Sequence, residues 1–309
     1  MHSSERLKGL DVFVSVVDAG SFTAASERLN LTNSAVGKAV ARLEGRLGVR
    51  LFERTTRRLS LTDAGQAFYR TCQQVLGDLE EAEHSLKAEG TAPVGKLRID
   101  LPATYGRMRV MPLLLDFLKK YPGVQPHISF TDRFVDLVED GIDLAVRIGG
   151  SDTWPTPIGY RFIGHERRVF CCSPAYLASA GPILGLEALP ARDAVVYKRA
   201  DGSASPWFIR RATGPVEHFH PLARMAVGSA EAHVEAVVSG FGIAQLSTWL
   251  IEDRLASGEL VEVLPAHAVE GLPLYLLWLR SRQQLPKVDA LLQHLSLIHI
   301  SEPTRQEAI

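Results

Sequence analysis

This 309-residue sequence has no long apolar run, no apolar signal-peptide core in its first ten residues and too few cysteines for a disulfide framework. No run of 18 or more apolar residues occurs, so a membrane-spanning helix is not expected. The opening MHSSERLKGL lacks the apolar segment of a signal peptide, which indicates a cytoplasmic protein. Three cysteines are too few for a disulfide framework. Cys171 and Cys172 lie in an apolar run typical of a buried strand, with a redox switch as the alternative.

Motifs of catalysis and of metal binding are also lacking. Residues 202–206, GSASP, lack the second glycine of a nucleophile elbow. Residues 240–242, GFG, do not continue into a dinucleotide-binding fingerprint and precede a predicted strand rather than a helix. His218 and His220 have no evident third ligand, and no Cys/His spacing indicates zinc. We therefore expect no enzymatic activity, no metal and no cofactor.

The charge is balanced over the whole chain but not along it. The sequence holds 34 Lys and Arg against 35 Asp and Glu, whereas residues 1–62 hold ten against six. Within residues 38–58 the excess comes from seven basic residues, Lys38, Arg42, Arg46, Arg50, Arg54, Arg57 and Arg58. A local basic surface of this kind is typical of phosphate binding.

Residues 21–47 read as two short helices joined by a tight turn. Thr32 is a good N-cap for the second helix. Its buried face is predicted to carry Val36, Val40, Leu43 and Leu47, and its outer face Asn33, Ser34, Gly37, Lys38, Ala41 and Arg42. A thin, polar and basic helix face can enter the DNA major groove. A solvated amphipathic helix is the alternative.

The flanking residues carry a family resemblance. The patterns AGSFTAASERL, SAVGKAVARLE, LGVRLFER and LTDAG follow one another between Ala19 and Gly65. Together they resemble the DNA-binding domain of LysR-type transcriptional regulators, which implies a winged helix-turn-helix in residues 1–62. The family usually has Gln where Asn33 stands and Ser where Gly37 stands. We expect DNA contacts from Ser21, Thr23, Thr32, Asn33, Ser34, Ala35, Gly37, Lys38, Arg42, Arg54, Thr56, Arg57 and Arg58.

A long helix is predicted over residues 63–89. Phe68, Cys72, Val75, Leu79, Ala82 and Leu86 are spaced as a heptad seam, which needs a partner helix. The resemblance implies a linker helix that pairs with its copy in a second subunit, through Phe68, Val75, Leu79 and Leu86. Packing of this helix on its own domain is the alternative. We expect a homodimer or a homotetramer.

Residues 90–95, GTAPVG, form a predicted hinge, after which strands and helices alternate. Strands are predicted at 96–101, 125–131 and 143–148, with helices at 107–121 and 134–140, and this rhythm predicts a parallel sheet. Residues 96–294 resemble the effector-binding domain of the same regulators, similar to periplasmic binding proteins. The resemblance implies one subdomain of residues 96–164 and 271–294, and another of 165–270, with a cleft between them.

Ligands of parallel sheets bind at the carboxyl ends of strands. This rule selects Thr104, Thr131 and Arg147 as effector-binding candidates, with Ser229 as a fourth at a helix start. A threonine after a strand is also an ordinary cap. A guanidinium that closes the apolar strand LAVRI needs an anionic or carbonyl partner, so we expect a small carboxylate-bearing effector.

The fold class is therefore a multidomain α+β protein. We expect a regulator of the LysR type that binds a dyad operator in double-stranded DNA. The alternative is a solute-binding protein with an accessory helical domain. Residues 295–309 begin LSLIHISEPTR, which resembles a translated sequencing-library adaptor, so we expect the native sequence to end near His294 and the tail to lack packing partners.

Overall fold

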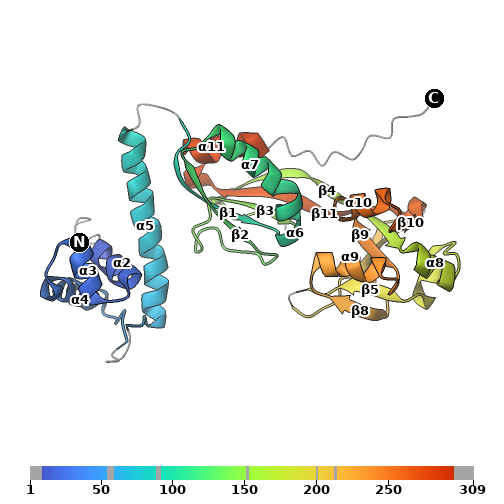
Figure 1. Ribbon diagram of the computed structural model, residues 1–309, viewed down its shortest axis with the longest axis horizontal. Helices are drawn as coiled ribbons and strands as arrows, with labels where there is room; N and C mark the ends of the chain where they lie inside the picture. Colours follow the sequence, from blue (N-terminus) through green and yellow to red (C-terminus); the bar gives the residue numbers. More distant parts are fainter. Residues whose placement is uncertain are drawn as a thin grey trace. The chain divides into compact units, whose positions relative to one another are not determined.

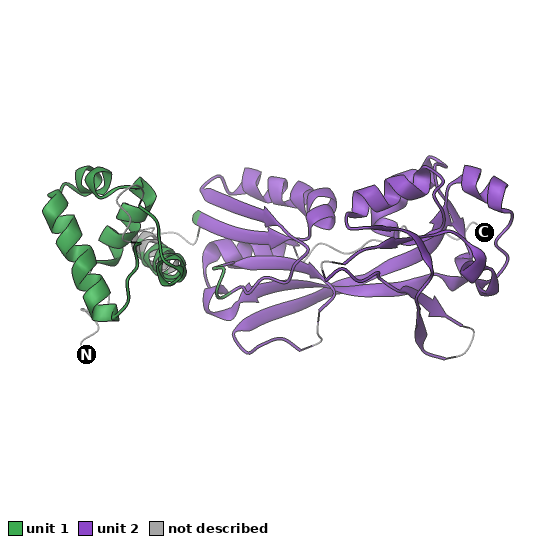
Figure 2. Cartoon of the chain, turned by 90° about the horizontal axis from the view of Figure 1, so that it is seen from below, with its two compact units in different colours: residues 1–95, 138–141 green, residues 96–137, 142–309 purple. Residues whose placement is uncertain are grey.

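The computed structural model describes residues 9–53, 59–87, 92–150, 153–199, 201–211 and 214–295. The chain divides into two compact units, residues 1–95 with 138–141 and residues 96–137 with 142–309 (Figure 2). The wing tip at 54–58, the hinge residues 88–91 and the tail 296–309 lie outside the described residues. None of the described helices is long and apolar enough to cross a membrane.

Four helices lie in the described part of the first unit (Figure 1). They are α2 (Leu10–Ala19), α3 (Phe22–Leu29), α4 (Asn33–Leu47) and α5 (Asp63–Lys87). Ser21 caps α3 by accepting from the Ala24 amide at 3.1 Å, and Thr32 caps α4 by accepting from Ala35 at 3.2 Å. Asn30 ends α3 in the left-handed conformation. The predicted helix-turn-helix is therefore present, with the predicted cap at Thr32.

The wing is attached to this helical core by specific contacts. Phe52 pairs with Leu61 as an antiparallel bridge. Glu44 of α4 accepts from the backbone amides of Leu51 at 2.7 Å and Phe52 at 3.2 Å. Gly65 lies so close to the wing that an added Cβ would stand 2.0 Å from the Leu51 carbonyl oxygen. Glu44 and Gly65, both within the family pattern, therefore hold the wing against α4 and α5.

The second unit is built on one mixed sheet in the order β10-β4-β11-β3-β1-β2, with β9 also paired to β4. Its strands are β1 (Gly95–Leu101), β2 (Val124–Phe130), β3 (Leu144–Ile148), β4 (Ile158–Cys172), β9 (Ala244–Ser247), β10 (Val261–Val263) and β11 (Val269–Leu279). Strands β1 and β3 are parallel, as predicted, but β11 runs antiparallel to both β3 and β4. The parallel pairing is therefore confirmed for β1 and β3, and the complete sheet is mixed because of β11.

Long strands β4 and β11 continue between two lobes of this unit (Figure 1). In the first lobe the helices α7 (Met111–Lys120) and α11 (Pro286–Leu295) pack on the sheet. The second lobe contains α8 (Pro174–Ala180), α9 (Ala230–Val238) and α10 (Thr248–Ala256), and the paired strands β5 (Ala194–Tyr197) with β8 (Ala223–Val227) and β6 (Trp207–Arg210) with β7 (Val216–Phe219). Short 3-10 segments lie at Leu186–Ala191, Pro265–His267 and Arg280–Arg282.

Three local predictions are corrected. Residues 134–136 have no regular structure and residues 137–140 form a turn, so the predicted helix is absent. Of their apolar residues only Leu137 is buried, while Phe134 and Val138 are exposed. The helix predicted at 107–121 begins instead with the short α6 (Ala103–Tyr105) and a π-helical turn, η1 (Gly106–Val110). Helix α11 includes Leu295, which is fully buried in the core of the first lobe, so the expectation of an unpacked tail is wrong for this residue.

Candidate functional sites

Helix α4 presents a polar face around its N-terminus. Val36, Val40 and Leu43 are buried in the core of the first unit, whereas Asn33, Ser34, Lys38 and Arg42 are exposed. Leu47 was expected on the buried face, but it is 37% exposed because α4 ends there and extends past the core. The exposed N-terminal turns are those that a recognition helix inserts into the major groove.

Some of the predicted DNA-contact residues already use their side chains in hydrogen bonds within the protein. Ser21 and Thr32 use their side-chain oxygens to cap α3 and α4. Thr23 is exposed and accepts from Nδ2 of Asn33 at 3.3 Å, so these two side chains form one polar surface. Ala35 and Gly37 are half-buried. The four predicted wing contacts Arg54, Thr56, Arg57 and Arg58 lie outside the described residues.

The predicted seam of α5 divides into two parts. Cys72 is buried in the core of the first unit, and Phe68 packs against Phe13 there with ring centroids 5.7 Å apart. The alternative, packing within its own domain, therefore holds for the first turns of α5. Val75 and Leu79 are instead 38% and 47% exposed. The side chain of Leu86 lies outside the described part of the helix.

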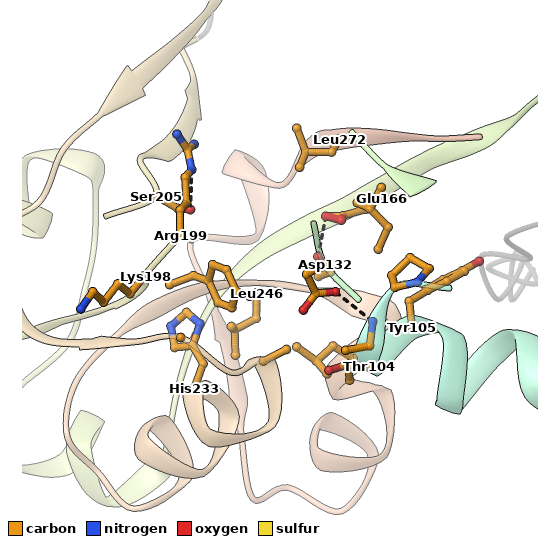
Figure 3. A pocket seen from close by; sticks show the side chains of 18 of the residues that line it. Thr104, Tyr105, Asp132, Glu166, Lys198, Arg199, Ser205, His233, Leu246 and Leu272 are labelled. Atoms are coloured by element: carbon orange, nitrogen blue, oxygen red, sulfur yellow. Dashed lines mark hydrogen bonds between the residues drawn. The ribbon is translucent and has the colours of Figure 1, made fainter. Parts of the chain in front are cut away.

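A pocket of about 1010 Å³ lies between the lobes of the second unit (Figure 3). Residues at or just after the carboxyl ends of β1, β2 and β3 line it from the first lobe, and residues around β5, β6, α9 and α10 line it from the second. The segment 104–109 reaches across to the second lobe beside this pocket. Arg107 forms an ion pair with Glu231 of α9, and Arg109 donates to the Trp249 carbonyl at 2.8 Å.

The four predicted effector residues have different positions. Thr104, Thr131 and Arg147 line the pocket, whereas Ser229 does not, although its neighbours in sequence do. Ser229 caps α9 by accepting from the Ala232 amide at 3.3 Å. Thr131 accepts from the Arg133 amide at 3.1 Å, which is the capping role weighed as its alternative.

Thr104 is buried and its hydroxyl hydrogen-bonds to Glu231. Burial alone would raise the pKa of Glu231. Hydrogen bonds from its own backbone amide, Thr104, Ser229 and Arg107 outweigh this effect and hold that pKa below its ordinary value. Glu231 is therefore ionised and joins the two lobes.

The guanidinium of Arg147 already has its anionic partner. Nη2 lies 2.5 Å from Oδ1 of Asp100 on β1, and Nη1 donates to the Val146 carbonyl at 2.8 Å. Both side chains are buried, 4% and 2% exposed. The argument that Arg147 needs a partner from the ligand is therefore wrong, because the chain supplies that partner 47 residues away.

Sequence reasoning missed a buried polar cluster on β4. Glu166 is 3% exposed and lines the pocket. Its Oε2 accepts from Ser247 Oγ at 2.7 Å and from Arg168 Nε at 3.1 Å. The guanidinium of Arg168 also lies 5.1 Å from the ring centroid of Phe208. The run of four polar residues at 165–168, HERR, was the available signal, but this segment was interpreted only as a boundary between subdomains.

His233 of α9 is a second missed residue that lines the pocket. It is buried, and its Nε2 lies 3.0 Å from the Val195 carbonyl oxygen. Burial lowers its pKa, and the nearby Arg168 charge lowers it further, against the opposing effect of the hydrogen bond to Val195. His233 is therefore a neutral hydrogen-bonding group near pH 7.

Basic side chains outnumber carboxylates around the pocket. Arg133, Arg147, Arg168, Lys198 and Arg199 line it, together with the carboxylates Asp132, Glu166 and Asp201. Arg147 and Arg168 are paired with Asp100 and Glu166. Within the described residues, Arg133, Lys198 and Arg199 form no ion pair with a carboxylate, and Arg199 donates to Ser205 at 3.1 Å.

Comparisons with known proteins agree with this arrangement. Residues 7–66 match the family described as bacterial regulatory helix-turn-helix protein, lysR family, and residues 90–296 match the LysR substrate binding domain. The chain is 33% identical over 294 residues to the probable HTH-type transcriptional regulator LtrA of Klebsiella pneumoniae, covering 94% of each chain. It is 35% identical over 271 residues to the HTH-type transcriptional regulator DmlR of Escherichia coli K12, covering 86% of each.

A solved structure shows the same likeness over the full length. CrgA, a LysR-type transcriptional regulator from Neisseria meningitidis, matches with a TM-score of 0.60 and 29% identity, covering 97% of this chain and all of that one. A capped helix-turn-helix joined to a two-lobed α/β unit with a central pocket defines a ligand-responsive DNA-binding protein. The chain belongs to the LysR family of transcriptional regulators, and the sequence-based identification is confirmed.

Proposed function

We propose that this regulator reads a dyad operator with two copies of α4 and that its pocket takes a small anionic effector. The observation that carries the effector class is the set of three pocket cations, Arg133, Lys198 and Arg199, none of which forms an ion pair with a carboxylate among the described residues. An anion would gain charge-assisted hydrogen bonds there. A carboxylate remains the proposed group, now bound by these side chains rather than by Arg147.

On the DNA, Asn33, Ser34 and Lys38 would contact base edges, because they are exposed on the first turns of α4. Arg42 and the wing residues Arg54, Arg57 and Arg58 would contact phosphates. Val75 and Leu79 would pair the α5 helices of two subunits, because they are the exposed large apolar residues among the described side chains of that helix. The spacing of half-sites would then follow from the dimer.

Lys198 and Arg199 provide the test of the effector class. We expect the double variant Lys198→Gln, Arg199→Gln to lose the binding of small carboxylates, measured by isothermal titration calorimetry with a panel of aliphatic and aromatic acids. Binding to DNA from upstream of the gene should persist in the absence of ligand. Arg211→Gln is the matched control, since Arg211 is exposed, pairs with Glu217 and does not line the pocket. Equal carboxylate affinities in all three proteins would contradict the proposal.

A further inference from the structure

Aromatic surface dominates the apolar part of the pocket. Five aromatic side chains that are not fully buried line it, Phe130, Phe134, Tyr197, Phe208 and Trp249. Phe130 and Phe134 are 38% and 59% exposed, although large apolar side chains are usually covered. A ligand with a ring would cover these side chains and gain the favourable geometry of aromatic pairs. A purely aliphatic small acid would leave most of this surface in water.

Glu166 presents an acceptor that the protein does not use. Both hydrogen bonds to this buried carboxylate, from Ser247 and from Arg168, end on Oε2. No described residue donates a hydrogen bond to Oε1. Figure 3 shows the Glu166 carboxylate turned towards the group of lining side chains. This oxygen remains accessible from the pocket, so a ligand hydroxyl or amino group can donate a hydrogen bond to its charge.

Glu166 lies on a different side of the pocket from Lys198 and Arg199. Glu166 and Asp132 are on one side in Figure 3, and Lys198 and Arg199, which follow β5, are on the other. A ligand that spans the pocket therefore meets cations at one end and an acceptor at the other. The aromatic side chains lie among the lining residues that such a ligand would contact.

We propose that the effector is a ring-bearing acid that also carries a hydroxyl or amino group, and that Glu166 selects this donor group. The inference rests on the proposed anionic effector and adds to it the ring and the donor. Glu166 is a specificity-determining residue in this account, since it contacts the ligand directly. Arg168 and Ser247 position it, because they fix which of its two oxygens remains available.

Substitution of Glu166 by Gln gives a sharp prediction. Arg168 and Ser247 are both donors, so the amide oxygen of Gln takes the place of Oε2 and the NH₂ group takes the place of Oε1. The pocket then presents a donor where the wild type presents an acceptor. A ligand hydroxyl or amino group can no longer donate at this position, while any ligand oxygen that accepts a hydrogen bond, a methoxy oxygen included, gains a donor.

The experiment uses full-length protein and isothermal titration calorimetry with benzoate, 3- and 4-hydroxybenzoate, their methoxy counterparts, and hexanoate. The wild type should prefer one hydroxybenzoate over its methoxy partner by about 10- to 100-fold, the range of a hydrogen bond to a charged group. Glu166→Gln should abolish this preference. Glu262→Gln should keep it, because Glu262 is a half-buried carboxylate on β10 that does not line the pocket.

The outcomes separate the two proposals. If hexanoate binds and no benzoate does, the ring-bearing ligand is refuted while the anionic effector stands. If benzoates bind but neither hydroxy compound is preferred, or if Glu166→Gln keeps the preference, the role of Glu166 is refuted. If no acid binds the wild type, the anionic effector itself fails. Thermal unfolding of Glu166→Gln checks that the variant is folded, and retained benzoate affinity shows that its pocket is intact.

Discussion

Asp100 and Arg147 form a buried ion pair between the neighbouring parallel strands β1 and β3, with 2.5 Å between Oδ1 and Nη2. Ser129 of β2 also hydrogen-bonds to the Asp100 carboxylate, so these side chains join the three strands. Asp100 therefore neutralises the charge of Arg147 within the protein. Any ligand role of this residue is therefore limited to the donors that Asp100 and Val146 leave free.

Removal of Arg147 should consequently affect stability as well as ligand binding. Arg147→Ala leaves Asp100 buried and unpaired, which costs about 3–5 kcal/mol. The double variant Asp100→Asn, Arg147→Met removes both charges and should recover much of this loss. Urea unfolding followed by tryptophan fluorescence checks the prediction, because all four tryptophans lie in the second unit. Equal stability of Arg147→Ala and wild type would contradict it.

His233 should make the second unit less stable in acid. Burial lowers the pKa of His233 from 6.5 in the folded state, so below pH 6.5 the unfolded state binds a proton that the folded state excludes. The free energy of unfolding should therefore fall as the pH drops from 6.5 towards the lowered pKa, and be unaffected by this group above 6.5. In His233→Gln this part of the pH dependence should disappear. Urea unfolding between pH 5 and pH 8 measures it, with His218→Gln as an exposed control.

Leu79 is the strongest test of subunit pairing. It is 47% exposed on α5 beside Val75, and a charge placed at a paired interface would be desolvated at a cost of several kcal/mol. Leu79→Lys should therefore dissociate the oligomer and weaken operator binding. Gln66→Lys places the same charge on another face of α5, where Gln66 is exposed, and should leave the oligomer intact. Sedimentation velocity distinguishes the two results, and an unchanged coefficient for Leu79→Lys would refute pairing through this residue.

Substitution of Gly37 should raise the stability of the first unit and weaken its binding to DNA. No atom lies within 4 Å of a Cβ added at Gly37 or Gly45 of α4, so Ala fits at both positions. Each substitution should stabilise the first unit by roughly 0.5–1 kcal/mol, the difference in helix propensity. Only Gly37→Ala should weaken DNA binding, because Gly37 lies beside Lys38 near the N-terminal end of α4 and Gly45 near its other end. Circular dichroism in urea and fluorescence anisotropy measure the two effects, and equal affinities would contradict a close approach of DNA at Gly37.

Local patterns predicted local structure well. The cap at Thr32, the buried residues Val36, Val40 and Leu43 and the long helix α5 depend on neighbours a few positions away, and the structure confirms them. Contacts between distant segments were not predictable from such patterns. Asp100 meets Arg147 only because β1 and β3 are neighbours in the sheet.

The pocket residues that were missed share one cause. Glu166 is buried because β4 pairs with both β11 and β9, and Ser247 of β9 pairs with Arg168 in that sheet. Neither strand partner is adjacent in sequence. In the sequence, His233 likewise looks like an ordinary helix residue. Its hydrogen bond to Val195 forms only because the fold brings β5 beside α9. Sequence spacing identified the edge of the sheet that faces the pocket, but not the groups that the second lobe contributes.

The central claim is that α4 reads DNA sequence. Fluorescence anisotropy should compare wild type and Asn33→Ala on DNA from upstream of the gene and on random DNA of equal length, at fixed salt. Wild type should bind the upstream DNA at least about 10³-fold more tightly than random DNA. Asn33→Ala should reduce the difference in binding free energy between the two DNAs by roughly 1–3 kcal/mol, because Asn33 is exposed at the start of α4. The affinity for random DNA should be unchanged. Equal wild-type affinity for both DNAs, or an equal loss on both in the variant, would contradict the account.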